Sequence, residues 1–169
     1  MTQVDKARDA GKYLFVWDKQ GSVATFFKYK GHLAEIHREL IKVSLGRSTT
    51  AEVTEFLRKN LVISMRNGDR LMLDLNELTC DLKDAYKDPA VFDAEIVFNY
   101  AEWAKEENYI RYVKEDENHG IGGLNPGHYF RSEHFSLTVR SGAPTEDILQ
   151  EQIAKIPRFD SDFIKITIV

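Results

Sequence analysis

Residues 12–28 read KYLFVWDKQGSVATFFK, and we build the expected fold outward from this stretch. An apolar run ends in the acid Asp18, which is typical of a strand covered on both faces of a sheet. Gly21 supplies a turn, and from Ser22 onward apolar residues return at helical spacing. We therefore expect a strand over residues 12–18, a turn, and a helix that begins near Ser22.

Strand, turn and helix follow one another in this order in a P-loop, where backbone N–H groups at the helix N-terminus hold phosphate. If a nucleotide binds at this turn, Gln20, Gly21 and Ser22 are its expected contacts. The Gly-Lys-Ser/Thr sequence of a working loop is missing, so the lysine and the hydroxyl that contact the phosphates and Mg²⁺ are absent from it. The alternative is a plain turn in which Gly21 is needed for its backbone conformation.

The rest of the chain alternates between predicted helices and strands. The clearest helix spans Thr49–Asn67, because Thr49-x-x-Glu52 has the form of a capping box and Gly68 can supply a left-handed end. Pattern and composition predict the other elements: a helical stretch His32–Leu40, a short strand Ile41–Leu45, a strand Arg70–Leu75, a helix-rich region 78–117, a loop 120–127, a strand Phe135–Arg140, a helix Thr145–Ile156 and a final strand Phe163–Val169.

Five strands that alternate with helices predict an α/β fold, a three-layer sandwich with a five-stranded, mainly parallel sheet and helices on both faces. The length of 169 residues is that of one domain. Within residues 1–169 we expect residues 1–11 to form a flexible lead and residues 81–118 to form a helical insert.

Composition excludes several function classes. Hydrophobic and charged residues make up 43% and 30% of the chain, as in a soluble globular protein. The formal charge of −4 has the wrong sign for a general nucleic-acid binder, and no apolar run approaches the ~20 residues of a membrane helix. The polar start and the single cysteine, Cys80, predict a cytoplasmic protein. The five histidines lack an H-E-x-x-H spacing, so no metal site is expected.

Three groups of residues carry a resemblance to a known family. Asp18 is followed by Gln20-Gly21 and by a helix bearing Phe26-Phe27-Lys28; residues 56–74 give a helix, a Gly turn and an apolar strand; and residues 135–139, 145–156 and 163–169 give a later strand, a helix and a closing strand. In this order the chain resembles the fifth AAA+ module in the ATP-binding motor region of dynein heavy chains. Lys19 stands where the family usually has proline, and the family's small helical lid has no counterpart in the sequence.

The resemblance implies a P-loop NTPase (AAA+)-like fold with a degenerate Walker A sequence, because the fifth dynein module is regarded as structural and without a working nucleotide site. It therefore implies a catalytically inactive protein-interaction or scaffold domain without a cofactor. The context that it implies is a cilium or flagellum, with axonemal or microtubule-associated proteins as partners.

The alternative is a small nucleotide-binding protein or enzyme, an NTPase or kinase that uses ATP or GTP with Mg²⁺. Asp74, at the end of a predicted strand, would then help to hold Mg²⁺. Lys12, Lys19 or Lys28 would have to replace the missing lysine. The competing interpretation of Asp74 is a carboxylate that caps the next turn.

Two surfaces are candidates for partner binding. Trp103, Tyr109 and Tyr112 lie among alternating charges, where they would form either a docking face, since such residues are favoured at interfaces, or part of the core. The basic residues Lys28, Lys30, His32, Arg38 and Lys42 would either meet an acidic partner, such as a tubulin tail, or form a solvated helix face.

Overall fold

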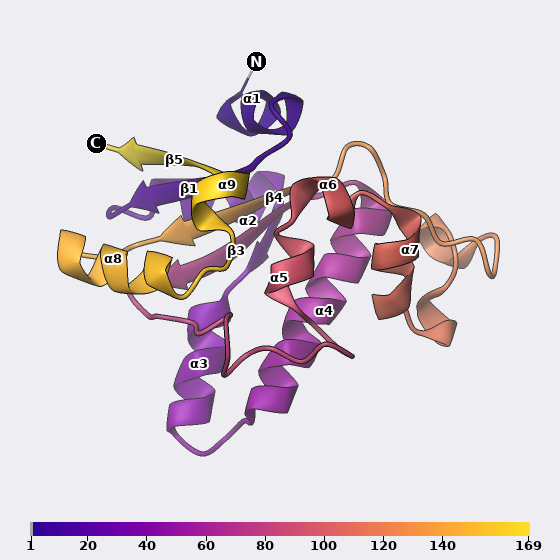
Figure 1. Ribbon diagram of the computed structural model, residues 1–169, viewed down its shortest axis with the longest axis horizontal. Coiled ribbons are helices and arrows are strands. Elements are labelled where there is room, and N and C mark those ends of the chain that lie inside the picture. The colour runs from indigo at the N-terminus through magenta and orange to yellow at the C-terminus, as the bar shows by residue number, and fades with distance from the viewer. Residues whose placement is uncertain (1) are drawn as a thin grey trace.

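The computed structural model describes residues 2–169, and at its centre is one sheet of five strands (Figure 1). In chain order the strands are β1 (Tyr13–Asp18), β2 (His32–Ala34), β3 (Arg70–Asn76), β4 (Ser136–Ser141) and β5 (Phe163–Ile168). Their spatial order is β2-β3-β4-β1-β5, and every neighbouring pair is parallel. The predicted α/β class and five-stranded parallel sheet are confirmed.

Helices cover both faces of the sheet. Alternate side chains of β1 divide between two cores: Tyr13 and Phe15 belong to the larger core, and Leu14 and Val16 to the smaller one. The helices α1 (Gln3–Asp9) and α2 (Ser22–Lys30) cover the smaller core. The larger core is covered by α3 (Ile36–Ser44), α4 (Thr50–Asn67), α5 (Ala94–Val97), α6 (Tyr100–Trp103), α7 (Glu106–Tyr109), α8 (Glu146–Ala154) and α9 (Phe159–Asp162).

The helix α4 begins and ends as the sequence predicts. The Thr49 side chain accepts a hydrogen bond from the Glu52 N–H at 3.2 Å, which satisfies one donor of the first turn. At the other end Gly68 adopts φ +72°, a left-handed conformation that glycine reaches without strain. Arg70 begins β3 directly afterwards, so α4 returns the chain to the sheet.

The second strand lies elsewhere than predicted. Residues 32–34 form β2, a short edge strand paired with β3, whereas Ile41–Leu45 continues and ends helix α3. The alternation of Ile41 with Leu45 does not reflect sheet burial, because both side chains are largely exposed on α3. Three residues between Gly31 and Glu35 are too few to show a period of two, and pairing with β3 makes them a strand.

The N-terminal residues 2–11, which composition predicts to be a flexible lead, contain helix α1, while Met1 lies outside the described residues. Thr2 and Asp5 form a capping box at the start of α1, and Ala7 is buried against Leu14 and Val16 of β1. Ala7 and the partly buried Val4 seat this helix, and contacts made by two small apolar side chains leave little trace in the composition.

The insert between β3 and β4 contains short helices rather than long ones. Besides α5, α6 and α7 it includes the 3₁₀ turns η1 (Ile110–Tyr112), η2 (Glu115–Glu117) and η3 (Ile121–Gly123). Arg58 of α4 fixes this region: its guanidinium donates to the Tyr112 carbonyl at 2.8 Å and to the Glu117 carboxylate at 2.6 Å. Within residues 2–169, the helices are all too short or too polar to span a bilayer.

Candidate functional site: a filled crevice at the strand ends

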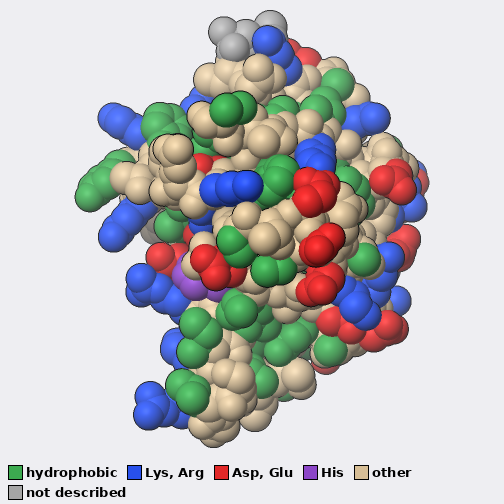
Figure 2. Space-filling view, turned by 90° about the vertical axis from the view of Figure 1, so that its left-hand side faces the viewer, with side chains coloured by type: hydrophobic (Ala, Val, Ile, Leu, Met, Phe, Trp, Pro, Cys, Tyr) green, Lys and Arg blue, Asp and Glu red, His purple; other side chains and the backbone are tan. Residues whose placement is uncertain are grey.

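The sheet has a topological switch point between β1 and β4. The chain leaves β1 toward β2 on one side and leaves β4 toward β5 on the other. In open α/β sheets, ligands bind in the crevice outside the carboxyl ends of the strands at such a point. The turn from Asp18 to Ser22 and the end of β3 both lie at this edge, which faces the viewer in Figure 2.

The turn after β1 is held by the protein's own carboxylate. Asp18 is fully buried, and its side chain accepts hydrogen bonds from the backbone N–H groups of Gly21 at 3.1 Å and Val23 at 2.8 Å. Val23 lies in the first turn of α2, where free N–H groups and the helix dipole attract an anion. A carboxylate therefore already occupies donors that a phosphate group would need.

Arg140 fills the centre of the crevice from β4. Its Nη2 donates to the Asp18 carbonyl at 2.7 Å, and its Nη1 donates to the Asp74 carboxylate at 2.8 Å. Its Nε lies 3.5 Å from the Asp18 carboxylate. All three side chains are buried, so neighbouring strands β1, β4 and β3 are joined by an Asp–Arg–Asp network.

Little space is left above the turn. A Cβ added to Gly21 would lie 3.6 Å from Arg140 Nη2. A Cβ added to Gly142, just after β4, would meet Asn76 Oδ1 at 2.6 Å and Arg140 Nη2 at 3.0 Å. The distance at Gly21 is an ordinary contact, whereas at Gly142 the side chains of Asn76 and Arg140 approach the backbone closely. Polar groups of this chain therefore pack against both sides of the crevice.

The four residues predicted to contact a nucleotide lie around Arg140 but differ in exposure. Gly21 and Asp74 flank Arg140, whereas Gln20 and Ser22 are exposed. Gly21 has φ +79°, a left-handed conformation that favours glycine. This is what the alternative interpretation, a plain turn between strand and helix, requires of Gly21. Asp74 accepts the Asn76 N–H at 2.9 Å, so it caps the following turn in addition to binding Arg140.

Sequence reasoning missed Arg140, which is the side chain that links the site. The only sequence signal is a basic residue at the end of a predicted buried strand, where an unpaired charge would be costly. Its partners depend on register: Arg140 pairs with Asp74 on β3 and with Val16 on β1. The sequence reasoning also missed His37 at this site, whose Nδ1 lies 3.1 Å from the Asp74 carbonyl oxygen.

The three aromatic residues predicted as a docking face are in the core. Trp103, Tyr109 and Tyr112 are 0%, 6% and 3% exposed, and the Trp103 and Tyr112 ring centroids are 5.4 Å apart. Of the two interpretations that the sequence leaves open, these rings therefore follow the core one, and the docking one is wrong for them. The bonds of Arg58 draw the insert onto α4 and turn its aromatic side inward.

A metal site has no support among the parts of the chain that the structure describes. Within residues 2–169 no group of three or more His, Cys, Asp or Glu side chains is arranged to hold an ion.

Cys80 is buried, and burial raises the pKa of its thiol to about 12, with a smaller contribution from Asp81. A thiol with this pKa stays protonated and is a poor nucleophile at neutral pH.

Fold and crevice together define a class: an α/β protein with an all-parallel sheet whose switch-point crevice is closed by its own charged side chains. Comparison of the chain with protein-family models, with curated proteins and with solved structures finds no match.

Proposed function

We propose that this protein is a catalytically inactive, P-loop-like domain that acts as a protein-interaction or scaffold component. The observation that carries the proposal is the closed crevice, in which Asp18 takes the N–H groups at the start of α2 and Arg140 joins Asp18 to Asp74. A triphosphate at this turn would have to displace a buried carboxylate of the same charge. It would also have to separate a buried ion pair, which is strongly unfavourable when one partner is left alone.

The resemblance to the fifth dynein module agrees with this proposal, because that module is regarded as structural. The finer fold class, P-loop NTPase of the AAA+ type, is part of the proposal. It is supported by the strand–turn–helix at residues 13–30 at a switch point of an all-parallel sheet. A ciliary or flagellar setting is likewise proposed from the resemblance, with microtubule-associated proteins as the expected partners.

The edge of the sheet at β2 offers a surface for such a partner, which we call the β2-edge surface. On α2 the rings of Phe26 and Tyr29, which lie within one helical turn of each other, are 50% and 76% exposed. Large exposed apolar side chains that gather in one region mark interaction sites. Lys28 of α2 and Arg38 of α3 line a hollow of about 280 Å³ at this edge.

Charge indicates an acidic partner for the β2-edge surface. Residues 22–47 hold five Lys or Arg and two Glu, although the whole chain is acidic. The two Glu pair with Arg38 and Lys42 at 2.8 Å, so the cations without an ion pair to the described residues are Lys28, Lys30 and Arg47. Figure 2 shows Lys and Arg side chains gathered on the left, which is the side of α2, and many Asp and Glu on the right. Opposite potentials steer partners together and fix their orientation.

Co-sedimentation with microtubules tests the proposed function, since microtubules present acidic tails. We expect the wild-type protein to sediment with microtubules at low salt. A variant with Phe26→Ser and Tyr29→Ser should sediment much less, whereas Arg111→Gln, a charge change on the exposed face of the insert, should match the wild type. Equal sedimentation of the Phe26/Tyr29 variant, or none by the wild type, contradicts the proposed partner class.

A further inference from the structure

A recess of about 270 Å³ opens at the amino ends of the strands, whereas the filled crevice lies at their carboxyl ends. It lies near the beginnings of β1 and β4, and its walls come from α1, the insert and the segment before β4. The residues that matter for its chemistry are Arg8, Tyr100, Tyr109, Arg131 and Phe135. An enclosed cavity of about 10 Å³, the room of one water molecule, adjoins the recess and shares four of its lining residues.

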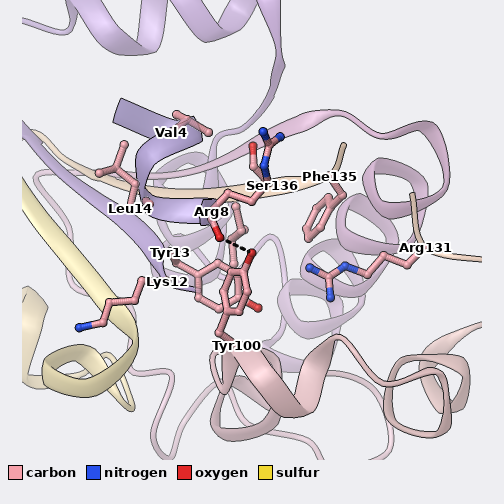
Figure 3. Close-up of a pocket in the computed structure, with 11 residues that line it drawn as sticks. Val4, Arg8, Lys12, Tyr13, Leu14, Tyr100, Arg131, Phe135 and Ser136 are labelled. Carbon is pink, nitrogen blue, oxygen red and sulfur yellow. Dashed lines mark hydrogen bonds between the residues drawn. The ribbon is translucent and has the colours of Figure 1, made fainter. Parts of the chain in front are cut away.

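Arg131 brings an unneutralised positive charge to the recess. Its guanidinium lies 5.2 Å from the Phe135 ring centroid, as in a cation–π contact. Figure 3 shows the Arg131 side chain reaching toward Tyr100, with Phe135 beside it. Within residues 2–169, no carboxylate lies within ion-pair distance of this guanidinium, and its N–H groups make no hydrogen bond to the protein.

The acidic side chains near the recess lie close to other basic residues and do not pair with Arg131. Arg8 has Asp5 at 3.4 Å and Asp9 at 3.9 Å, both from its own helix. Glu133 lines the recess, but its side chain is 90% exposed and lies 3.9 Å from His134. Arg131 is therefore the charge that a ligand in the recess would meet.

Two hydroxyl groups extend this donor set. The Tyr109 hydroxyl accepts the Arg131 backbone N–H at 3.4 Å, which leaves its own proton available to a ligand. The Ser136 hydroxyl lines the adjoining cavity, is buried, and makes no hydrogen bond with the described residues. The Tyr100 hydroxyl is already used, since it donates to the Arg8 carbonyl at 3.3 Å.

We propose that this recess binds a small oxyanion, the phosphate or carboxylate group of a small molecule. The Arg131 guanidinium supplies a planar fork of N–H donors that matches either group, and the Tyr109 hydroxyl supplies one further donor. The adjoining cavity has the room of one water molecule, which would link the unpaired Ser136 hydroxyl to the ligand. The site thus binds anions at the amino ends of the strands, while the carboxyl ends are closed.

Titration followed by backbone and arginine side-chain NMR tests this site, with sodium phosphate and sodium succinate as separate probes and sodium chloride of matched ionic strength as the blank. We expect saturable shifts around Arg131, Tyr109 and Ser136 with a dissociation constant in the millimolar range. The probe that binds more tightly identifies which oxyanion the recess prefers.

Variants make the result specific. Arg131→Gln should weaken binding by about tenfold or more, because a charge-assisted hydrogen-bonding group is lost. Tyr109→Phe should weaken it about threefold, as for the loss of one neutral hydrogen bond. Arg111→Gln should bind as the wild type does.

Thermal unfolding of each variant controls for loss of the fold. If Arg131→Gln is unstable, Arg131→Lys takes its place. It keeps the charge but lacks the planar fork of donors, so it should bind with an affinity between those of the wild type and a variant without the charge. The proposal is overturned if neither probe gives a saturable shift up to about 50 mM, far above a millimolar dissociation constant. It is equally overturned if Arg131→Gln, or Arg131→Lys in its place, binds as tightly as the wild type.

Discussion

At the scale of single residues, Arg140 is the side chain on which the closed crevice depends. It is buried between Asp18 and Asp74, and it is the only cation within ion-pair distance of the Asp18 carboxylate among residues 2–169. Neutralising one member of such a network leaves a buried charge without compensation.

Arg140→Leu should therefore lower the free energy of unfolding by about 3–5 kcal/mol, as expected when one partner of a buried ion pair is removed. Urea unfolding monitored by circular dichroism measures the change. Arg111→Leu, at an exposed position, is the matched control and should change stability by no more than about 0.5 kcal/mol. Equal stability of the two variants would show that Arg140 does not hold the crevice.

Two buried tyrosines make a second matched pair. The Tyr112 hydroxyl makes no hydrogen bond with the described residues, whereas the Tyr129 hydroxyl donates to the Val62 carbonyl at 2.7 Å. Tyr112→Phe should be neutral or stabilising, because an unpaired buried hydroxyl is removed, and Tyr129→Phe should cost about 1 kcal/mol. Denaturant titration separates them, and a larger loss for Tyr112→Phe would place its hydroxyl in a different environment.

Residue-scale features were only partly predictable from the sequence. The left-handed conformation of Gly21 and the turn-capping role of Asp74 could be anticipated, because each depends on neighbours in the chain. The bond of Arg140 to Asp74 spans 66 positions and needs the register of two strands, which no local pattern specifies. For the same reason the burial of Trp103 was left open.

At the scale of elements, Arg58 connects α4 to the insert. The carboxylates that bind Arg58 titrate at acidic pH, so we expect the stability of this connection to depend on pH. Its hydrogen bonds lower the pKa of Glu55 from 4.5 to about 2. At Glu117, burial raises the pKa, but the hydrogen bond from Arg58 and the further bonds outweigh burial and leave that pKa below its ordinary value. Arg58 itself is almost fully buried, so these carboxylates also compensate its charge.

Stability should fall as pH drops from about 4.5 toward 2. A carboxyl group with a depressed pKa in the folded state stabilises the fold fully above its unfolded pKa and loses that effect as pH falls through the folded value. Urea midpoints between pH 6 and pH 2.5 measure this loss. Replacing Glu55 and Glu117 by Gln should flatten the profile in that window, and an unchanged profile would assign the acid sensitivity to other groups.

Elements with strong local signals were predicted best. The cap residues of α4 and the apolar runs of β1 and β3 fixed their positions. β2 and α1 were missed because pairing with β3 and the seating of Ala7 on β1 determine them, and both are contacts between segments. The insert was predicted as helical by composition, but its helices are too short to show a helical period.

At the scale of the whole molecule, the carboxyl ends and the amino ends of the strands differ in chemistry. The carboxyl ends of β1, β3 and β4 are closed by the Asp–Arg–Asp network, and the amino ends carry the recess with Arg131. A nucleotide could then produce a binding signal through its phosphates at the recess without entering the crevice. Any nucleotide assay must therefore report where binding occurs.

The backbone N–H signals of Gly21 and Val23 report this directly, because Asp18 holds both groups. The decisive measurement follows them by NMR while ATP or GTP with Mg²⁺ is titrated into the wild-type protein and into Arg131→Gln. We predict that the Gly21 and Val23 signals stay unchanged in both proteins, and that the shifts around Arg131 need about tenfold or more nucleotide in the variant than in the wild type. Saturable movement of the Gly21 and Val23 signals, retained in Arg131→Gln, would show a working nucleotide crevice and contradict the inactive domain proposed for this chain.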